Sequence, residues 1–518
     1  MKAICFALDS SAAKITPKAI LSSEWRCRRL HKPRVFQRVY LDSLDWRLLK
    51  RDRYLIADRI GDGFHLHLFD LGENRTIVAE TSNQLPDFAR SLPEGPLAAM
   101  LAPILQPRAL VPQIRLAVER HSMAVLDGDN QTVAHLDLEV SKPQLEGAGG
   151  STRVYRRLWF TPIKGYERQD RAIISALSDY GLPMLSAVIP VTDLISALNV
   201  DKSRFDARSA GDIHAADRCD RAVKHLLRSL LSVMEANRPP VVSDIDSECL
   251  HDFRVAVRHA RSLLAQASGV LDQGRLEEAK SFFARLNKVT TAQRDLDVML
   301  LNFDFYRSML PARTREHLEP VHKYAVERRA AAAKSTARFV QSANYRQFVK
   351  AWRKYLDARV ASRTSLIYAM KPVKDFADAR IWRVCKRVIA QGKAIDDNSP
   401  PEALHSLRKR CKTLRHLVEF FSPLYPAGNI KNVMANLKRL QDNLGKFQDS
   451  HVHIGLLSDV RSALGKRGLL SPSVDAALTE VIRVLDGQQA DCRKQFNKRF
   501  LEFSAERHQH LFKQLFRQ

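Results

Sequence analysis

The feature that most constrains this chain is an internal repeat of a basic motif. The segments His251–Arg261 and His405–Arg415 both follow the pattern H-x-x-R-x-x-x-[R/K]-x-x-R, and they lie 154 residues apart. The match continues without a gap, because Arg285 aligns with Arg439 at the same offset, and an aspartate follows 44 residues after each histidine. Identical spacing over this length predicts a duplicated helical unit, with two bundles facing each other about a pseudo-twofold axis.

Each motif places its basic residues along one side of a helix. At 100° per residue, the four basic positions fall within an arc of about 80° and extend over about 15 Å. Like charges aligned on a helix repel one another, so we expect an anion to lie against them. The first stripe is His251, Arg254, Arg258 and Arg261, and the second stripe is His405, Arg408, Lys412 and Arg415. Further candidate binding residues are Arg285, Lys438 and Arg439, and Lys224 and Arg228 are basic residues that could extend the surface.

The residue types in the stripes suit phosphate. An arginine guanidinium can donate two parallel hydrogen bonds to phosphate oxygens and keeps its charge, and a histidine can gain a proton beside phosphate. The aspartates of the repeat, Asp295 and Asp449, are expected to orient the cationic groups rather than to contact the ligand. A solvated, ion-paired helix face is the alternative reading, and the duplication favours anion binding over it.

The net charge supports a polyanionic partner. The chain of 518 residues has a formal net charge of +26. Residues 1–210 hold 29 basic and 24 acidic side chains, whereas residues 211–518 hold 54 and 33, so most of the excess belongs to the second region. A strong basic excess is typical of proteins that bind nucleic acid, an anionic membrane or a soluble polyanion.

Other features of the composition point to a cytoplasmic protein. The seven cysteines are scattered and form no C-x-x-C pair, which argues against a zinc ribbon or a disulfide scaffold and suits a reducing compartment. The first residues are too briefly apolar for a signal peptide, and no uncharged apolar run reaches the length of a membrane span. We therefore expect no membrane span, no metal and no cofactor; the sequence leaves the oligomeric state open.

The spacing of apolar residues changes from a strand-like to a helical period along the chain. This change predicts an α+β protein of two domains, 1–200 and 211–518, with a polar linker at 201–211. The first domain is predicted to be an antiparallel sheet or barrel, with its clearest hairpin at Ser122–Leu126 and Thr132–Val140 around an Asp-Gly-Asp-Asn turn. The second is predicted to be all helical. Its expected helices lie near 216–236, 247–269, 275–303, 313–336, 343–368, 373–394, 400–422, 430–449 and 474–518, with Pro239-Pro240 among the breakers between them.

These residues resemble the CHAD family, the conserved histidine α-helical domains, over about 211–518. The resemblance rests on the two motifs, on the run Arg294–Val298 and on Leu437–Gly445. One departure is His259, where the family often has a second arginine. The resemblance implies two four-helix bundles around a basic central groove that binds inorganic polyphosphate. It also implies a binding module without catalysis that is associated with polyphosphate granules.

The N-terminal domain resembles a degenerate CYTH domain, the triphosphate tunnel fold that is often fused to CHAD domains. The run Arg38–Leu49, the strand His135–Val140 and the segment Ile163–Glu167 carry this resemblance, but the opening E-x-E-x-K is absent. Asp137 and Glu139 are candidate survivors of a metal-binding face. Since carboxylates hold the metal that bridges a triphosphate, a structural domain without catalytic residues is the favoured interpretation.

Three functions therefore remain at the level of sequence. The favoured one is binding of inorganic polyphosphate. Nucleic-acid binding through the same surface is the second, although single-strand binders usually place aromatic side chains among their cations, and the stripes have Val255, Val257, Leu407 and Leu414 there instead. The third is a metal-dependent triphosphatase in the N-terminal domain.

Overall fold

The computed structural model describes residues 4–8, 25–72, 75–144, 154–180, 182, 184–185, 191–197, 213–396 and 398–517. The chain divides into two compact units, Met1–Ser203 and Arg204–Gln518. The expected linker at 201–211 lies outside the described residues. In the described part of the chain, no helix is long and apolar enough to cross a membrane.

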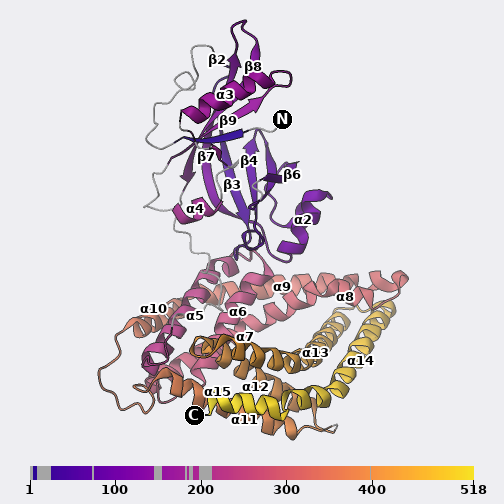
Figure 1. Cartoon of the computed structure of the whole chain (residues 1–518). Helices are drawn as coiled ribbons and strands as arrows, with labels where there is room; N and C mark the ends of the chain where they lie inside the picture. The colour runs from indigo at the N-terminus through magenta and orange to yellow at the C-terminus, as the bar shows by residue number, and fades with distance from the viewer. Residues whose placement is uncertain are drawn as a thin grey trace. The chain divides into compact units, whose positions relative to one another are not determined.

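The first unit is a curled antiparallel ten-stranded sheet that forms a half-barrel (Figure 1). The strand order is β10-β1-β9-β8-β7-β3-β4-β5-β6, and β2 pairs with β7 off this path. The strands are β1 (Ile4–Leu8), β2 (Arg26–Arg29), β3 (Arg34–Asp42), β4 (Arg53–Ile60), β5 (Gly63–Asp70), β6 (Arg75–Ser82), β7 (Val111–Leu126), β8 (Thr132–Gln144), β9 (Tyr155–Pro162) and β10 (Met184–Leu185). The predicted hairpin is present as β7–β8, but β7 begins eleven residues earlier than expected.

The apolar side chains of the strands pack into three hydrophobic clusters. Val39 and Leu55 pack with the leucines of α2 (Pro96–Leu105). Their neighbours Tyr40 and Ile56 pack in another cluster, with residues of α4 (Val191–Ala197). On β8 and β9, the apolar residues pack against α3 (Glu167–Asp179). Because successive side chains of a strand point to opposite faces of the sheet, helices cover this sheet on more than one side.

The second unit is helical throughout. Its α-helices are α5 (Cys219–Val242), α6 (Ser247–Leu264), α7 (Gln273–Leu301), α8 (Phe303–Ser308), α9 (Glu319–Val340), α10 (Ala343–Asp357), α11 (Val373–Lys393), α12 (Pro401–Phe420), α13 (Ala427–Lys466), α14 (Pro472–Phe503) and α15 (Glu506–Phe516), and η3 (Ala312–Leu318) is a 3-10 helix. The helices α5, α6, α7 and α9 pack into a first bundle; α11 to α14, with α15 against α11 and α13, form a second.

The duplication is visible in the helix boundaries and in the contacts between copies. The starts of α11, α12 and α13 each follow those of α5, α6 and α7 by 154 residues. The backbone N–H of Cys219 donates to the carbonyl of Lys371, and the N–H of Val373 donates to the carbonyl of Asp217, each at 2.9 Å or less. Asp217 and Lys371 are repeat equivalents, and so are Cys219 and Val373. The two hydrogen bonds are therefore related by the symmetry of the repeat, as expected beside a twofold axis.

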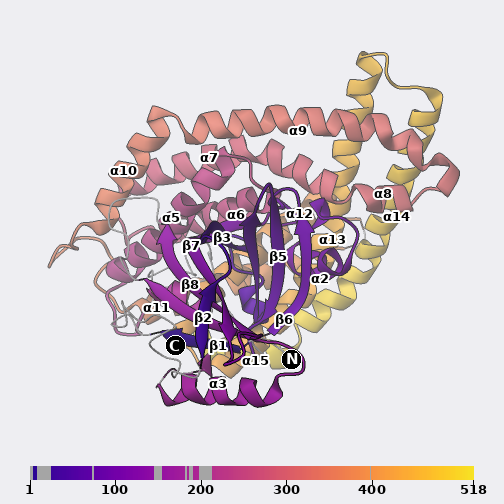
Figure 2. The same cartoon turned by 90° about the horizontal axis from the view of Figure 1, so that it is seen from above.

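A second point on this axis lies between α6 and α12. The Ser262 hydroxyl is 2.8 Å from Nδ1 of His416, and these two residues are themselves 154 apart. A residue can contact its own repeat equivalent only where it lies close to the axis relating the copies. The predicted pseudo-twofold arrangement is therefore confirmed, and α6 and α12, which carry the stripes, meet at the axis. In the first bundle, α7 and α9 lie side by side (Figure 2).

Several helix ends differ from the prediction. The helix α5 continues through Pro239 and Pro240 to Val242, because only the last turn loses hydrogen bonds there. The helix α10 ends eleven residues early, at Asp357, and α13 runs on to Lys466. The extended α13 and α14 share one apolar core with α8 and with the ends of α7 and α9. This core includes Met299, Phe303 and Leu478. The two bundles are therefore joined rather than separate.

Close packing also fixes the far end of α14. A Cβ atom on Gly392 of α11 would lie 2.0 Å from Cε2 of Phe500 on α14. The repeat equivalent of Gly392 is Arg238, so this contact belongs to the second copy alone.

Candidate anion-binding site

In the first stripe, on α6, His251, Arg254 and Arg258 are half-buried and Arg261 is exposed, and α7 holds Arg254. Arg254 Nη1 donates to the Asn287 carbonyl at 3.0 Å and to the hydroxyls of Thr290 and Thr291 at 2.6 and 3.2 Å. Burial above all, opposed by Asp295 and reinforced by Arg258, Arg294 and Arg261, lowers the pKa of Arg254 to about 10. The guanidinium thus bears a charge that its surroundings leave partly uncompensated.

The second stripe is held by α13 through different partners. Arg408 Nη2 donates to Asp449 Oδ1 at 3.5 Å, and His405 Nδ1 makes a short contact with Gln448 Oε1. Arg415 donates to Glu419 at 2.8 Å and to Gln441 at 3.4 Å. Each residue of the second stripe is half-buried, so the helix α12 presents its cations from a partly desolvated surface.

The cations of the two copies act on each other electrostatically. Burial lowers the pKa of Arg258, and Arg408 of the other copy is the charge that lowers it most. Burial, followed by Arg408 and then Arg258, lowers the pKa of Lys412 to about 8. The fold therefore brings like charges from two distant segments into one field, where each makes the other harder to keep charged.

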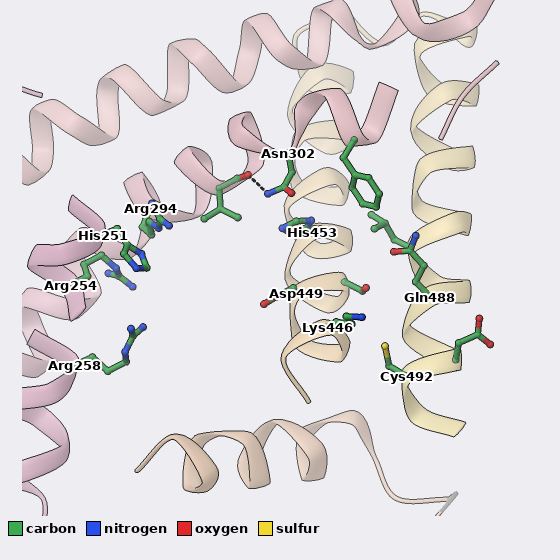
Figure 3. A pocket seen from close by; sticks show the side chains of 15 residues that line it. His251, Arg254, Arg258, Arg294, Asn302, Lys446, Asp449, His453, Gln488 and Cys492 are labelled. Atoms are coloured by element: carbon green, nitrogen blue, oxygen red, sulfur yellow. Dashed lines mark hydrogen bonds between the residues drawn. The ribbon is translucent and has the colours of Figure 1, made fainter. Parts of the chain in front are cut away.

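A pocket of about 760 Å³ opens beside the first stripe (Figure 3). His251, Arg254, Arg258 and Arg294 line one side, and Lys446, Asp449 and His453 of α13 lie across from them. The remaining lining residues are Val298, Asn302, Phe305, Ser450, Leu485, Gln488, Asp491 and Cys492. The basic wall faces a mixed wall that includes two carboxylates, so an anion would lie closer to α6 and α7 than to α14.

The structure separates two of the predicted binding residues, Arg285 and Arg439, from the stripes and leaves Lys438 on the side of the second stripe. The Arg285 guanidinium lies 5.4 Å from the ring centre of Phe339 on α9, and residue 285 is about 160° around α7 from Asn287, which holds Arg254. Arg439 is likewise about 160° around α13 from Gln441, which holds Arg415. Lys438 is about 60° from Gln441, on the side of the second stripe, and is exposed.

Two of the pocket's cations were absent from the predicted site. Arg294 donates to the Ser247 carbonyl at 3.2 Å and to Glu248 at 3.3 Å. It lies on the face of α7 that carries Asn287 and Thr291, a relation that helical spacing could have revealed. Lys446 comes from α13 and carries no comparable signal, because its approach to the first stripe depends on how the bundles pack.

The two aspartates of the repeat behave differently. Asp295 is partly buried; burial raises its pKa, and Arg254 and Arg294 oppose that rise. Among the described residues, it forms no ion pair with Arg254. Asp449 contacts Arg408, lines the pocket and is 65% exposed. Asp449 therefore contacts a cation of the second stripe directly, whereas Asp295 acts on Arg254 only through its charge.

His259, the departure from the family pattern, faces away from the pocket into the contact between copies. Its ring centre is 4.4 Å from that of His416 and 5.3 Å from that of Phe420. Burial, followed by His259, lowers the pKa of His416 to about 2. His259, His416 and Glu419 hold their ligand atoms within 4.8 Å of one another, the one such cluster in the described part of the chain. Arg415 already donates to Glu419, and the surrounding cations disfavour a metal ion there.

In the first unit, the candidate metal carboxylate Glu139 is occupied by arginines. Arg38 donates to Glu139 at 2.6 Å and to both oxygens of Asp58 at 2.7 and 2.8 Å, and Arg120 donates to Glu139 at 2.9 Å. Burial alone would raise the pKa of Glu139, but Arg38 and Arg120 lower it. Both oxygens of this buried carboxylate are thus engaged, which does not fit a metal ligand.

Comparison with known proteins identifies the helical unit. Residues 225–458 match the family model of the CHAD domain, so the chain contains a CHAD domain, as the resemblance predicted. The crystal structure of the CHAD domain from the plant Ricinus communis is similar, with 20% identity and a TM-score of 0.48 over 57% of this chain and 96% of that one. PptA from Streptomyces chartreusis is 12% identical, with a TM-score of 0.41 over 55% of this chain and 99% of its own. None of the curated proteins matches the sequence. The half-barrel of the first unit is consistent with a CYTH-like tunnel.

Proposed function

Starting from the CHAD domain that the chain contains, we propose that the helical unit binds inorganic polyphosphate along the first and second stripes. The bound chain would lie in a groove that includes the pocket beside α6 and continues past α12. In this proposal the protein binds its ligand without transforming it and is targeted to cytoplasmic polyphosphate granules.

The observation that carries the proposal is the contact between α6 and α12, which brings half-buried cations of the two copies within electrostatic reach of one another. Arg258 and Lys412 occupy equivalent positions; Arg258 helps to lower the pKa of Lys412, and Arg408 of the second copy lowers the pKa of Arg258. Half-buried like charges raise the free energy of the unliganded protein. An anion that contacts both stripes removes this repulsion and gains charge-assisted hydrogen bonds with the guanidinium groups.

Polyphosphate suits the stripes better than nucleic acid does. Val257, Leu407 and Leu414 are fully buried between the cations, and so is Phe253, the one phenylalanine within the two motifs, so they offer no platform for bases. Phe305, 46% exposed, is the one aromatic residue among the described residues that line the pocket. A chain of phosphoryl groups needs only donors and charge, which the stripes supply.

The first unit is proposed to be a structural domain rather than a triphosphatase. The engagement of Glu139 by Arg38 and Arg120 supports this, because a triphosphate tunnel needs free carboxylates for its metal and free cations for its substrate. Release of phosphate from tripolyphosphate in the presence of Mg²⁺ or Mn²⁺ would contradict it.

Charge reversal in each copy tests the proposal. The pairs Arg254→Glu with Arg258→Glu, and Arg408→Glu with Lys412→Glu, should each weaken binding of labelled long-chain polyphosphate at least a hundredfold, since each removes two charge-assisted contacts worth about 1.5–3 kcal/mol apiece. Arg328→Glu with Lys334→Glu is the matched control, because both residues are exposed on α9 and do not line the pocket beside α6.

Circular dichroism and thermal unfolding would show whether the reversed pairs still fold. If either pair does not, Arg258→Gln and Lys412→Gln replace it, and each should weaken binding about tenfold. Binding by both stripe variants that equals binding by the control would reduce the stripes to solvated surface.

A further inference from the structure

A second basic pocket lies on the first bundle, away from the stripes. Its volume is about 560 Å³, and none of its lining residues lines the pocket beside α6. The helix α5 contributes Arg221, Lys224, His225 and Arg228, and the other wall is residues 356–360, at the end of α10 and just beyond it. We call it the α5–α10 pocket. Lys224 and Arg228, which the sequence offered as extensions of the stripes, belong here instead.

Helical spacing gathers the four α5 residues on one face. Positions 221, 224, 225 and 228 fall within an arc of about 100° around the helix axis. The helices α5 and α10 pack against each other, so the chain leaving α10 closes the pocket opposite this face. Arg359, on that departing segment, adds a further cation from the other wall.

The pocket has more positive charge than its carboxylates neutralise. Among its described lining residues, Arg221, Lys224, Arg228 and Arg359 are cationic and Asp357 is the sole carboxylate. Arg228 Nε donates to Asp357 at 2.6 Å, which compensates one cation. The adjacent Asp220 is paired with Arg218 at 2.8 Å. In the described part of the chain, the side chains of Arg221 and Arg359 form no ion pair.

Lys224 is fixed in place with a donor to spare. Its Nζ donates to the carbonyls of Tyr355 and Ala358 at 2.9 and 3.2 Å and lies 4.4 Å from the ring centre of Tyr355. An ammonium has three N–H donors, so one remains for a ligand. Burial lowers the pKa of Lys224, and a nearby anion would offset that cost.

Comparison of the copies shows that the fold does not require these cations. The repeat equivalents of Arg221, Lys224, His225 and Arg228 are Asp375, Asp378, Ala379 and Trp382. Asp378 accepts hydrogen bonds from Lys374 and from the Tyr425 hydroxyl, and it is buried. The same helix position thus serves packing in one copy and concentrates cations in the other.

We propose that the α5–α10 pocket is a second binding site for phosphoryl anions, separate from the stripes. Arg221, Arg359 and Lys224 would donate to the phosphoryl oxygens, and Arg228 would stay with Asp357. The site is independent of the proposed function, because it uses different residues on a different face of the first bundle. Its ligand is either a free phosphorylated compound or a further part of the polyphosphate chain that contacts the stripes.

Calorimetric titration of the full chain with inorganic tripolyphosphate tests this site. Two binding events are expected at about physiological salt. Arg221→Glu with Arg359→Glu should weaken one event at least tenfold and leave the other within threefold, whereas Arg254→Glu with Arg258→Glu should do the reverse. The control pair Arg328→Glu with Lys334→Glu imposes the same change in net charge and should leave both events within threefold.

Lys224 supplies a direct readout of occupancy. Saturating tripolyphosphate should reduce its acylation by an amine-reactive reagent at least fivefold, measured by mass spectrometry, in wild type and in the stripe variant but not in Arg221→Glu with Arg359→Glu. Unchanged acylation together with identical titrations of the pocket variant and the control would overturn the proposal. A single event that the pocket variant removes would uphold it and contradict the proposed function of the stripes instead.

Long-chain polyphosphate distinguishes the two sources of the ligand. If one chain reaches both sites, it should abolish the tripolyphosphate event of the α5–α10 pocket and protect Lys224 in wild type but not in the stripe variant. If the pocket serves a free compound, tripolyphosphate should still bind there after the stripes are saturated. Either result upholds a phosphoryl-anion site.

Discussion

The two copies of the repeat carry the same stripe but hold it by different means. In the first copy, Arg254 donates to a backbone carbonyl and to two threonine hydroxyls, all neutral acceptors. In the second, its equivalent Arg408 donates to the carboxylate of Asp449. The cations at the third position also differ, since Arg258 is permanently charged and Lys412 can lose its proton near neutral pH.

The two copies therefore share the positions of their cations but not the residues that hold those cations. The spacing of the basic residues and the helix starts are identical in the two copies, whereas the partners of each cation are not. The retained third positions, Arg258 and Lys412, lie within electrostatic reach of each other. The proposal of one shared ligand accounts for this, because a single anion needs matching charges from both sides but not matching supports.

Single charge reversals at the equivalent third positions should give the largest effect on this comparison. Arg258→Glu and Lys412→Glu are each expected to weaken polyphosphate binding about thirtyfold or more at pH 7, because each replaces a charge-assisted contact with repulsion. Fluorescence anisotropy with labelled polyphosphate would measure both. A loss confined to one of them would mean that only that copy contacts the ligand.

The copies should differ in their response to pH. Lys412 has a pKa of about 8 in the free protein, and a bound anion raises it. Below pH 8 the lysine is already charged; above pH 8 binding must take up a proton, so affinity should fall as pH rises, by up to tenfold per unit. Lys412→Arg should remove this dependence between pH 7 and 9. A steep dependence that survives in Lys412→Arg would assign the titration to another group.

Salt dependence should reveal equal contributions from the two stripes. Each phosphate contact with a single-stranded polyanion contributes a slope of about −0.7 to log K against log salt. Neutralising two cations, either Arg254→Gln with Arg258→Gln or Arg408→Gln with Lys412→Gln, should therefore make the slope shallower by about 1.4. Affinities measured over a range of NaCl concentrations supply the slopes. A change in only one variant would show that the other stripe is not in contact with phosphate.

The smallest effect is expected at the other pair of repeated arginines. Arg285→Ala and Arg439→Ala should each change polyphosphate affinity by less than about twofold, because helical geometry points both away from the residues that hold the stripes. The same anisotropy assay measures this. A tenfold loss in both would place the binding surface on the outer faces of α7 and α13 as well.

The sequence predicted what depends on spacing within a helix. The gapless offset predicted the duplication and the axis, and the positions within each motif predicted which cations share a face. Helical spacing along α7 likewise separates Arg285 from Asn287, which holds Arg254, and places Arg294 on the same face as Asn287. These residues were within reach of sequence reasoning.

Features that depend on packing between distant segments were out of reach. Lys446 approaches the first stripe only because α13 and α14 share a core with the ends of α7 and α9. The pairing of Glu139 with Arg38 and Arg120 requires the strand register of the curled sheet. The α5–α10 pocket requires the departure of the chain from α10 at Asp357, where the helical pattern alone predicted a longer helix.

The proposed selectivity for inorganic polyphosphate is tested most directly by competition between polyphosphate and nucleic acids. Labelled long-chain polyphosphate is bound to the full chain at about physiological salt and challenged with unlabelled polyphosphate, single-stranded DNA and RNA at matched phosphate concentrations. The account predicts that unlabelled polyphosphate displaces the label and that the nucleic acids do not. Equal displacement by DNA or RNA would contradict it and would show that the stripes recognise charge alone.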